Sequence, residues 1–111
     1  MTLGTRLRIK RGDTAPAFRA QCQADAGKAP ANLTGATARL LLRQHPTAPA
    51  KSLPLVVEDG TQGWVRRDWE AVDTAVVGSW DLEVEVTYAD GRVQTFPGGG
   101  YALLEIVPDL A

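Results

Sequence analysis

The stretch from Gly78 to Tyr88 constrains the fold more than any other part of this sequence. Large apolar side chains alternate strictly with polar ones along it. The apolar set is Trp80, Leu82, Val84, Val86 and Tyr88, and the polar set is Asp81, Glu83, Glu85 and Thr87. A period of two places successive side chains on opposite faces of a β-strand. A strand with one apolar face needs a second layer to cover it, so this stretch predicts a sandwich or barrel.

Similar alternation recurs in short segments along the whole chain, separated by turn residues such as the Asp90-Gly91 pair. Short strands at regular spacing predict an all-β fold, an antiparallel β-sandwich of seven to eight strands. Because Cys22 is the only cysteine, the sandwich is expected to lack a disulfide. The predicted inward-facing residues are Leu7, Ile9, Phe18, Ala20, Cys22, Leu40, Leu42, Trp80, Leu82, Val84 and Val86.

Three local features refine the expected strands. Pro54 lacks a backbone N–H and therefore places its strand at a sheet edge. The run Pro97-Gly98-Gly99-Gly100 is expected to interrupt the last pairing as a bulge or kink. Between Trp64 and Trp69 the pattern leaves two alternatives, with either Val65 and Trp69 or Trp64 facing inward.

The length and charge of the chain limit its class. With 111 residues, we expect one domain spanning 1–111. Lys and Arg total 12 against 13 Asp and Glu, so whole-chain electrostatics favour neither nucleic acid nor an anionic membrane as a partner. No apolar run is long enough to span a bilayer, and the first residues lack the apolar segment of a secretory signal. The sequence therefore predicts synthesis in a cytoplasm.

No residue set predicts catalysis, a cofactor or a metal. A nucleophile, a base and an orienting group cannot be placed together, so we expect a protein that is not an enzyme and uses no cofactor. His45 is the only histidine and lies in a proline-rich segment without neighbouring ligands, so no metal site is expected. Cys22 lies in an apolar set, which favours an inert core thiol over a reactive one.

Several short motifs have structural explanations. Arg11-Gly12-Asp13 matches the integrin tripeptide, but Gly-Asp is also turn chemistry, which we favour. Asn32-Leu33-Thr34 fits the glycosylation pattern, which is irrelevant in a chain that is not secreted. The three tryptophans offer stacking platforms for sugars, although at least two are explained more simply as core residues.

Two charged sets provide a candidate interaction surface. Arg6, Arg8 and Lys10 lie on the outward face of one predicted strand. Asp81, Glu83 and Glu85 lie on the outward face of another. Such opposed charges suit oriented docking of neighbouring subunits, and intramolecular pairing between the two strands is an equally physical account.

The segment from Asp73 to Leu82 is similar to the corner before strand F of immunoglobulin-like domains. Trp80 stands at the position of the corner tyrosine, and Leu82 stands at the position of the second cysteine. Cys22 stands at the position of the first cysteine. The resemblance implies an Ig-like sandwich of the disulfide-free kind.

Almost the whole chain also resembles the N-terminal Ig-like domain of tailed-phage baseplate upper proteins. The matching segments are Ile9-Lys-Arg-Gly12-Asp13-Thr14, Leu33-Thr34-Gly35-Ala36-Thr37, Gly63-Trp64-Val65 with Trp69, Asp73-Thr74 with Gly78-Ser-Trp80, Tyr88-Ala-Asp90-Gly91 with Thr95-Phe96-Pro97, and Ile106-Val107. In that family the domain is a virion structural part that joins other tail components and carries no chemistry.

The resemblance implies a structural protein of a phage or prophage tail or baseplate, located in the virion and partnered by other tail proteins. As an isolated chain it is expected to be a monomer or weak oligomer. The alternative is a carbohydrate-binding or host-recognition module on the same sandwich. An exposed pair of aromatic residues beside polar loops would favour that alternative, and buried tryptophans would favour the structural role.

Overall fold

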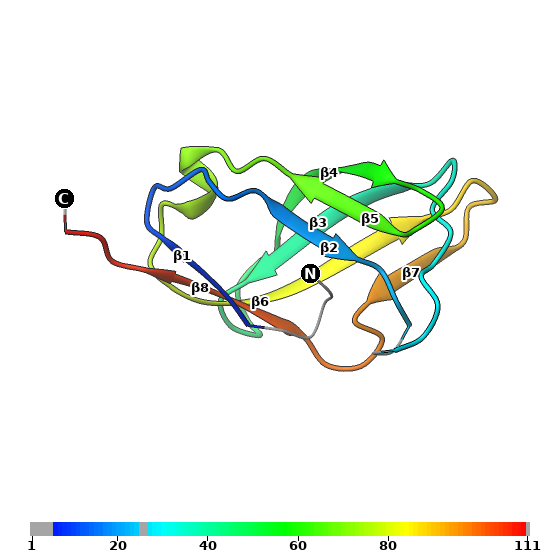
Figure 1. The fold of residues 1–111 in the computed structure, drawn as a ribbon. Helices are drawn as coiled ribbons and strands as arrows, with labels where there is room; N and C mark the ends of the chain where they lie inside the picture. The colour runs from blue at the N-terminus through cyan, green and yellow to red at the C-terminus, as the bar shows by residue number, and fades with distance from the viewer. Residues whose placement is uncertain (1–5, 25–26, 111) are drawn as a thin grey trace.

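Eight strands and one short 3₁₀ turn make up the computed structural model, which describes residues 6–24 and 27–110. In chain order the elements are β1 (Arg6–Lys10), β2 (Phe18–Gln21), β3 (Thr37–Arg43), β4 (Lys51–Asp59), β5 (Trp64–Arg67), η1 (Ala71–Thr74), β6 (Gly78–Thr87), β7 (Val93–Phe96) and β8 (Ala102–Val107). The strands form a curled sheet in which β2 and β5 cross over β3 and β6 (Figure 1). The predicted all-β sandwich is confirmed.

The sheet has the strand order β1-β8-β6-β3-β4-β5-β2, with β7 paired to β6. Strand β4 joins the two layers, because Lys51–Leu55 pairs with β3 whereas Val56–Asp59 pairs with β5. The register shifts between Val57 and Asp59, as in a β-bulge. Each half of β4 is therefore an edge of its own layer, which agrees with the edge position predicted from Pro54.

One strand pair differs from the predicted antiparallel arrangement. Strand β1 runs parallel to β8, with Ile9 opposite Ile106, whereas the other pairs are antiparallel. The alternation pattern says which face a residue occupies but carries no information on strand direction. Because β1 and β8 lie at opposite ends of the chain, no short turn forces them to be antiparallel.

The core is formed by the inward faces of both layers. Of the predicted inward residues, ten are buried, and Leu7 is half-buried against the same cluster. Val65 and Trp69 are buried while Trp64 is half-buried, which decides between the two alternatives for that segment. The core also contains Leu33, Leu55, Val65, Trp69, Phe96, Ala102, Leu104 and Ile106.

A polar corner connects β5 to β6 through η1. Arg67 forms an ion pair with Asp73 at 2.9 Å between Nη2 and Oδ2, and both side chains are largely buried. Asp73 Oδ2 also accepts a hydrogen bond from the backbone N–H of Glu70 at 2.8 Å. The Trp80 indole N–H donates to the Val76 carbonyl at 3.3 Å. These contacts fix where β6 begins and therefore which of its side chains face outward.

The chain that returns along β6 is interrupted between β7 and β8, where the sequence predicted a bulge or kink. Strands β7 and β8 pair with successive halves of β6: Phe96 lies opposite Val84, and Ala102 lies opposite Leu82. The intervening segment, residues 97–101, lies beside Glu83 as a bulge. It displaces Tyr101 from the ladder, leaving this side chain 54% exposed.

Candidate interaction surface

The six charged residues predicted as an interaction surface lie on one face of the molecule, the outer face of the layer β1-β8-β6-β3. Arg6, Arg8 and Lys10 are exposed on β1. Asp81, Glu83 and Glu85 are half-buried on β6, where they alternate with core residues. Strand β8 lies between β1 and β6, so the two sets share a face without being neighbours.

Most charges on this outer face are paired within the chain, although not with the partners that the sequence suggested. Arg6 and Arg8 both contact Glu105 of β8, at 3.3 Å and 2.9 Å between nitrogen and oxygen. Glu85 contacts Arg39 of β3 at 2.9 Å. Three of the six residues are thus paired within the chain, but with β8 and β3. The pairing between β1 and β6 that the sequence left open does not occur among the described residues.

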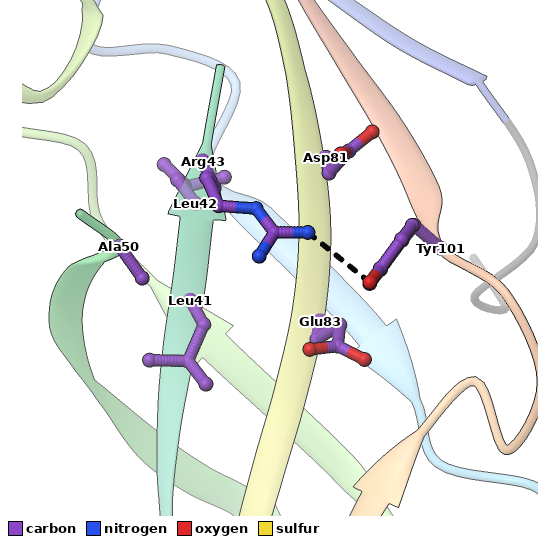
Figure 2. Close-up of a pocket in the computed structure, with 7 residues that line it drawn as sticks. All are labelled: Leu41, Leu42, Arg43, Ala50, Asp81, Glu83 and Tyr101. Atoms are coloured by element: carbon purple, nitrogen blue, oxygen red, sulfur yellow. Dashed lines mark hydrogen bonds between the residues drawn. The ribbon is translucent and has the colours of Figure 1, made fainter. Parts of the chain in front are cut away.

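A shallow depression lies near the middle of the outer face, between β3, β6 and the start of β8 (Figure 2). Its volume is about 60 Å³. The lining residues are Leu41, Leu42, Arg43, Ala50, Asp81, Glu83 and Tyr101. Leu41 and Arg43 alternate on β3 with Leu40 and Leu42, which the sequence predicted to face inward, so their outward position follows from the same pattern. Tyr101 could not be assigned, because the glycine run before it breaks the strand pattern.

Arg43 holds Tyr101 in place at this depression. Its Nη2 donates to the Tyr101 hydroxyl at 3.1 Å, and its guanidinium carbon lies 5.4 Å from the centre of the ring. Figure 2 shows the guanidinium between Asp81 and Glu83 and directed toward Tyr101. The Arg43 Nε is buried without a hydrogen-bond partner among the described residues. An exposed aromatic ring is thus fixed beside two carboxylates.

The tryptophans do not form an exposed pair. Trp69 and Trp80 are each 6% exposed. Trp64 is half-buried, and the Arg19 guanidinium lies over its ring, 5.0 Å from the centre. Phe18 packs against Trp69 with ring centroids 5.9 Å apart in an edge-to-face arrangement. These rings therefore support the core and the second layer.

A second concavity lies beside the hairpin between β6 and β7. This groove has a volume of about 450 Å³ and is lined by Ala31, Asn32, Tyr88, Arg92, Val93 and Gln94. The Tyr88 hydroxyl donates to Gln94 Oε1 at 2.6 Å, and Arg92 lies over the Tyr88 ring at 5.8 Å. Burial raises the pKa of the Tyr88 hydroxyl above its ordinary value. No pattern in the sequence indicated this groove.

The other sequence motifs have structural roles. Gly12, with φ of 79°, lies in the turn after β1 and donates its N–H to the Thr74 carbonyl at 3.1 Å. The Asn32 side chain accepts from the Thr34 N–H at 3.0 Å and so stabilises a turn.

His45 is exposed and contacts Thr47. Cys22 is fully buried, and burial raises the pKa of its thiol to about 12.

Two further classes of site are absent from the described residues. No group of three or more His, Cys, Asp or Glu side chains lies close enough to hold a metal ion there. Within residues 6–24 and 27–110, no helix is long and apolar enough to cross a membrane.

The comparisons with known proteins show a similar fold among solved structures. A scan of protein-family models gave no match, and a search of curated proteins gave none either. Among solved structures, the fold is similar to that of the N-terminal domain of phage TP901-1 ORF48, with a TM-score of 0.55. The superposition covers 93% of this chain and 83% of that chain at 13% sequence identity. The likeness thus concerns the fold of nearly the whole chain.

Proposed function

We propose that this chain is a non-enzymatic structural module of a phage or prophage tail or baseplate, located in the virion and bound to other tail proteins. The observation that carries the proposal is the fold similarity to a phage protein domain over 93% of the chain. The sequence resemblance to baseplate upper proteins supports the same assignment. The Ig-like subclass is part of the proposal and is supported by the bond from Trp80 to the Val76 carbonyl, which reproduces a tyrosine-corner contact.

The proposed docking surface is the outer face of the layer β1-β8-β6-β3. Tyrosine and arginine are enriched among residues that dominate binding energy at protein interfaces. Tyr101 is 54% exposed, and its contacts with Arg43 hold the ring in one orientation. A pre-oriented ring loses less conformational freedom when a partner binds, which favours affinity.

The proposal is tested with purified phage particles. Particles released by the bacterium that carries this gene are purified, and their proteins are quantified by mass spectrometry. We expect the chain to co-purify with tail proteins, and an antibody fragment against it to label the tail in electron micrographs. Recovery of the chain only in the unassembled fraction would overturn the proposal.

Two matched variants test the docking surface in the same experiment. Tyr101→Ala removes the aromatic group from the outer face, and Val56→Ala removes an apolar group that is 65% exposed on the other layer. An interface residue that contributes about 2 kcal/mol changes affinity about 30-fold. We therefore expect Tyr101→Ala to reduce incorporation strongly and Val56→Ala to leave it unchanged. Equal incorporation of the two variants would place the interface elsewhere.

A second candidate function, recognition of host carbohydrates, is favoured by the groove beside Tyr88. Its volume of about 450 Å³ lies within the range of small-ligand sites, and amide and guanidinium groups line it. Binding of the purified protein to a glycan array, abolished by Tyr88→Ala or Trp64→Ala and without particle association, would establish this function instead. The buried Trp69 and Trp80 remove the tryptophan platform that the sequence offered for it.

A further inference from the structure

The depression of Figure 2 differs from the rest of the outer face in that its carboxylates are not paired with a basic side chain in the part of the chain that the structure describes. Elsewhere on that face the carboxylates of Glu85 and Glu105 are paired with arginines within 3.3 Å. Among the described residues, Asp81 and Glu83 have no basic nitrogen within 4.0 Å. Both line the same depression.

Arg43 does not neutralise these two carboxylates. It lies opposite Asp81 in the strand register, yet its guanidinium donates to the Tyr101 hydroxyl instead. One guanidinium among two carboxylates leaves the depression with a net charge of −1. A half-buried surplus carboxylate favours a neighbouring cation more strongly than one in open water, because the effective dielectric constant there is lower.

The depression has the size of a side-chain head group. Its volume of about 60 Å³ is about twice the roughly 30 Å³ that one water molecule takes in the liquid. Leu41, Ala50 and the ring of Tyr101 form the apolar part of its lining, and Asp81 and Glu83 form the acidic part. An apolar wall beside a carboxylate suits a long aliphatic stem that ends in a cation.

We propose that this depression receives one basic side chain, an arginine or lysine, from a partner protein. The head group pairs with Glu83 and Asp81, and the stem lies along Leu41 and Tyr101. This inference rests on the proposed function, because it supplies the chemistry of the partner in a docking contact. It assigns Asp81 and Glu83 to recognition and leaves Glu85, which is already paired, as part of the fold.

The experiment uses N-acetyl-arginine amide as a probe, with N-acetyl-citrulline amide as its neutral counterpart of nearly the same shape. Backbone amide shifts of the whole chain are followed by NMR during titration. We expect saturable shifts for the arginine probe at residues 41–43, 81–83 and 101, with a Kd on the order of millimolar, as a ligand of this size allows. The citrulline probe should give no saturable shift there.

Three variants of equal charge change locate the contact. Glu83→Gln and Asp81→Asn should each weaken arginine binding at least threefold. Glu85→Gln removes one charge from the same strand but from a carboxylate that Arg39 already pairs, and it should leave the affinity within a factor of two. Native amide spectra of the variants confirm that the fold is retained.

Several outcomes overturn the inference. One is equal binding of arginine and citrulline probes, and another is equal loss in all three variants, which indicates unspecific charge attraction. Saturable binding of N-acetyl-glutamate amide at the same residues would identify Arg43 as the contact and an acidic partner instead. If the arginine probe does not bind while the chain still co-purifies with particles, only this inference is overturned. If the probe binds saturably but the chain is absent from particles, only the proposed phage function is overturned.

Discussion

Two ion pairs of the same length lie in very different parts of this molecule. At the corner between β5 and β6, Arg67 and Asp73 are 2.9 Å apart, and their side chains are 12% and 3% exposed. On the outer face, Arg8 and Glu105 are also 2.9 Å apart, but their side chains are 63% and 18% exposed. The two pairs have the same length and differ in how far their side chains are exposed to solvent.

The difference in burial separates structural charges from replaceable ones. If one partner of a buried pair is lost, the other charge is left without water or a counter-ion, which is strongly unfavourable. If one partner of an exposed pair is lost, water solvates the remaining charge at little cost. Loss of one charge at the corner is therefore expected to cost much stability, whereas the outer face can exchange internal pairs for contacts with a partner.

The largest effect is expected at the corner. Asp73→Ala removes the carboxylate that accepts from the largely buried Arg67 guanidinium and from the Glu70 N–H, and leaves Arg67 only the Pro54 carbonyl. We expect the free energy of unfolding to fall by about 3–5 kcal/mol. Asp68→Ala is the matched control, because Asp68 also pairs with an arginine nearby but its side chain is 76% exposed. Denaturant unfolding measures both, and equal losses would contradict the separation drawn from burial.

The next largest difference in stability is expected between the inner and outer faces of the central strands β3 and β6. Leu82 is fully buried on β6, whereas Leu41 lies half-buried on the outer side of β3. Leu82→Ala should lower the free energy of unfolding by about 2–5 kcal/mol. Leu41→Ala should lower it by roughly 1 kcal/mol, because only part of the side chain leaves water on folding. A larger effect at Leu41 than at Leu82 would mean that the assigned inner face is wrong.

Burial also affects how the free energy of unfolding depends on pH, through the thiol of Cys22. Burial raises the pKa of Cys22 to about 12, from an ordinary value near 9 that applies in the unfolded chain. The unfolded state therefore loses the thiol proton first, and stability falls between pH 9 and 12. The slope is about 1.4 kcal/mol per pH unit.

This thiol effect is measured as a difference between two proteins. Wild type and Cys22→Ala are unfolded at pH 8 and pH 10, so that titration of Tyr and Lys cancels. We expect wild type to lose about 1.4 kcal/mol more than the variant across that interval. A second readout is a thiol reagent, which should react only as fast as the native protein opens. Labelling within seconds at pH 8 would show that Cys22 is accessible.

Each sequence signal spans a limited number of residues, and this span decides which features of the structure it predicts. Alternation is local, so it placed the residues of β6, such as Leu82 and Glu83, on the correct faces. The choice between Trp64 and Val65 needed the register with β2 and β4, which the local pattern does not contain. The parallel pairing of β1 with β8 was missed for the same reason.

The candidate site shows the same limit more sharply. The outward charges of β1 and β6 were predicted, but their partners were not, because Arg8 and Glu105 are 97 residues apart in sequence. The glycine run was predicted to break the strand. Its consequence, the placement of Tyr101 beside Arg43 and Glu83, depends on how the bulge is oriented and has no signature in the pattern.

The smallest effect is expected for the exposed pair, where a double-mutant cycle isolates the interaction. Arg8→Ala, Glu105→Ala and the double variant are unfolded at low salt and in 1 M NaCl. Because Arg6 also contacts Glu105, the single loss at Glu105 removes two pairs, and only the cycle gives the term that belongs to Arg8. We expect a coupling free energy below about 1 kcal/mol, which high salt reduces further because it screens exposed charges.

The same cycle on Arg67 and Asp73 should give a larger coupling that changes little with salt, since screening ions do not reach a buried pair. If the Arg8–Glu105 coupling matched that of the corner in size and salt response, the outer face would be as fixed as the corner. Its charges would then be committed to the fold, and a partner could not exchange them without unfolding the layer on which it docks.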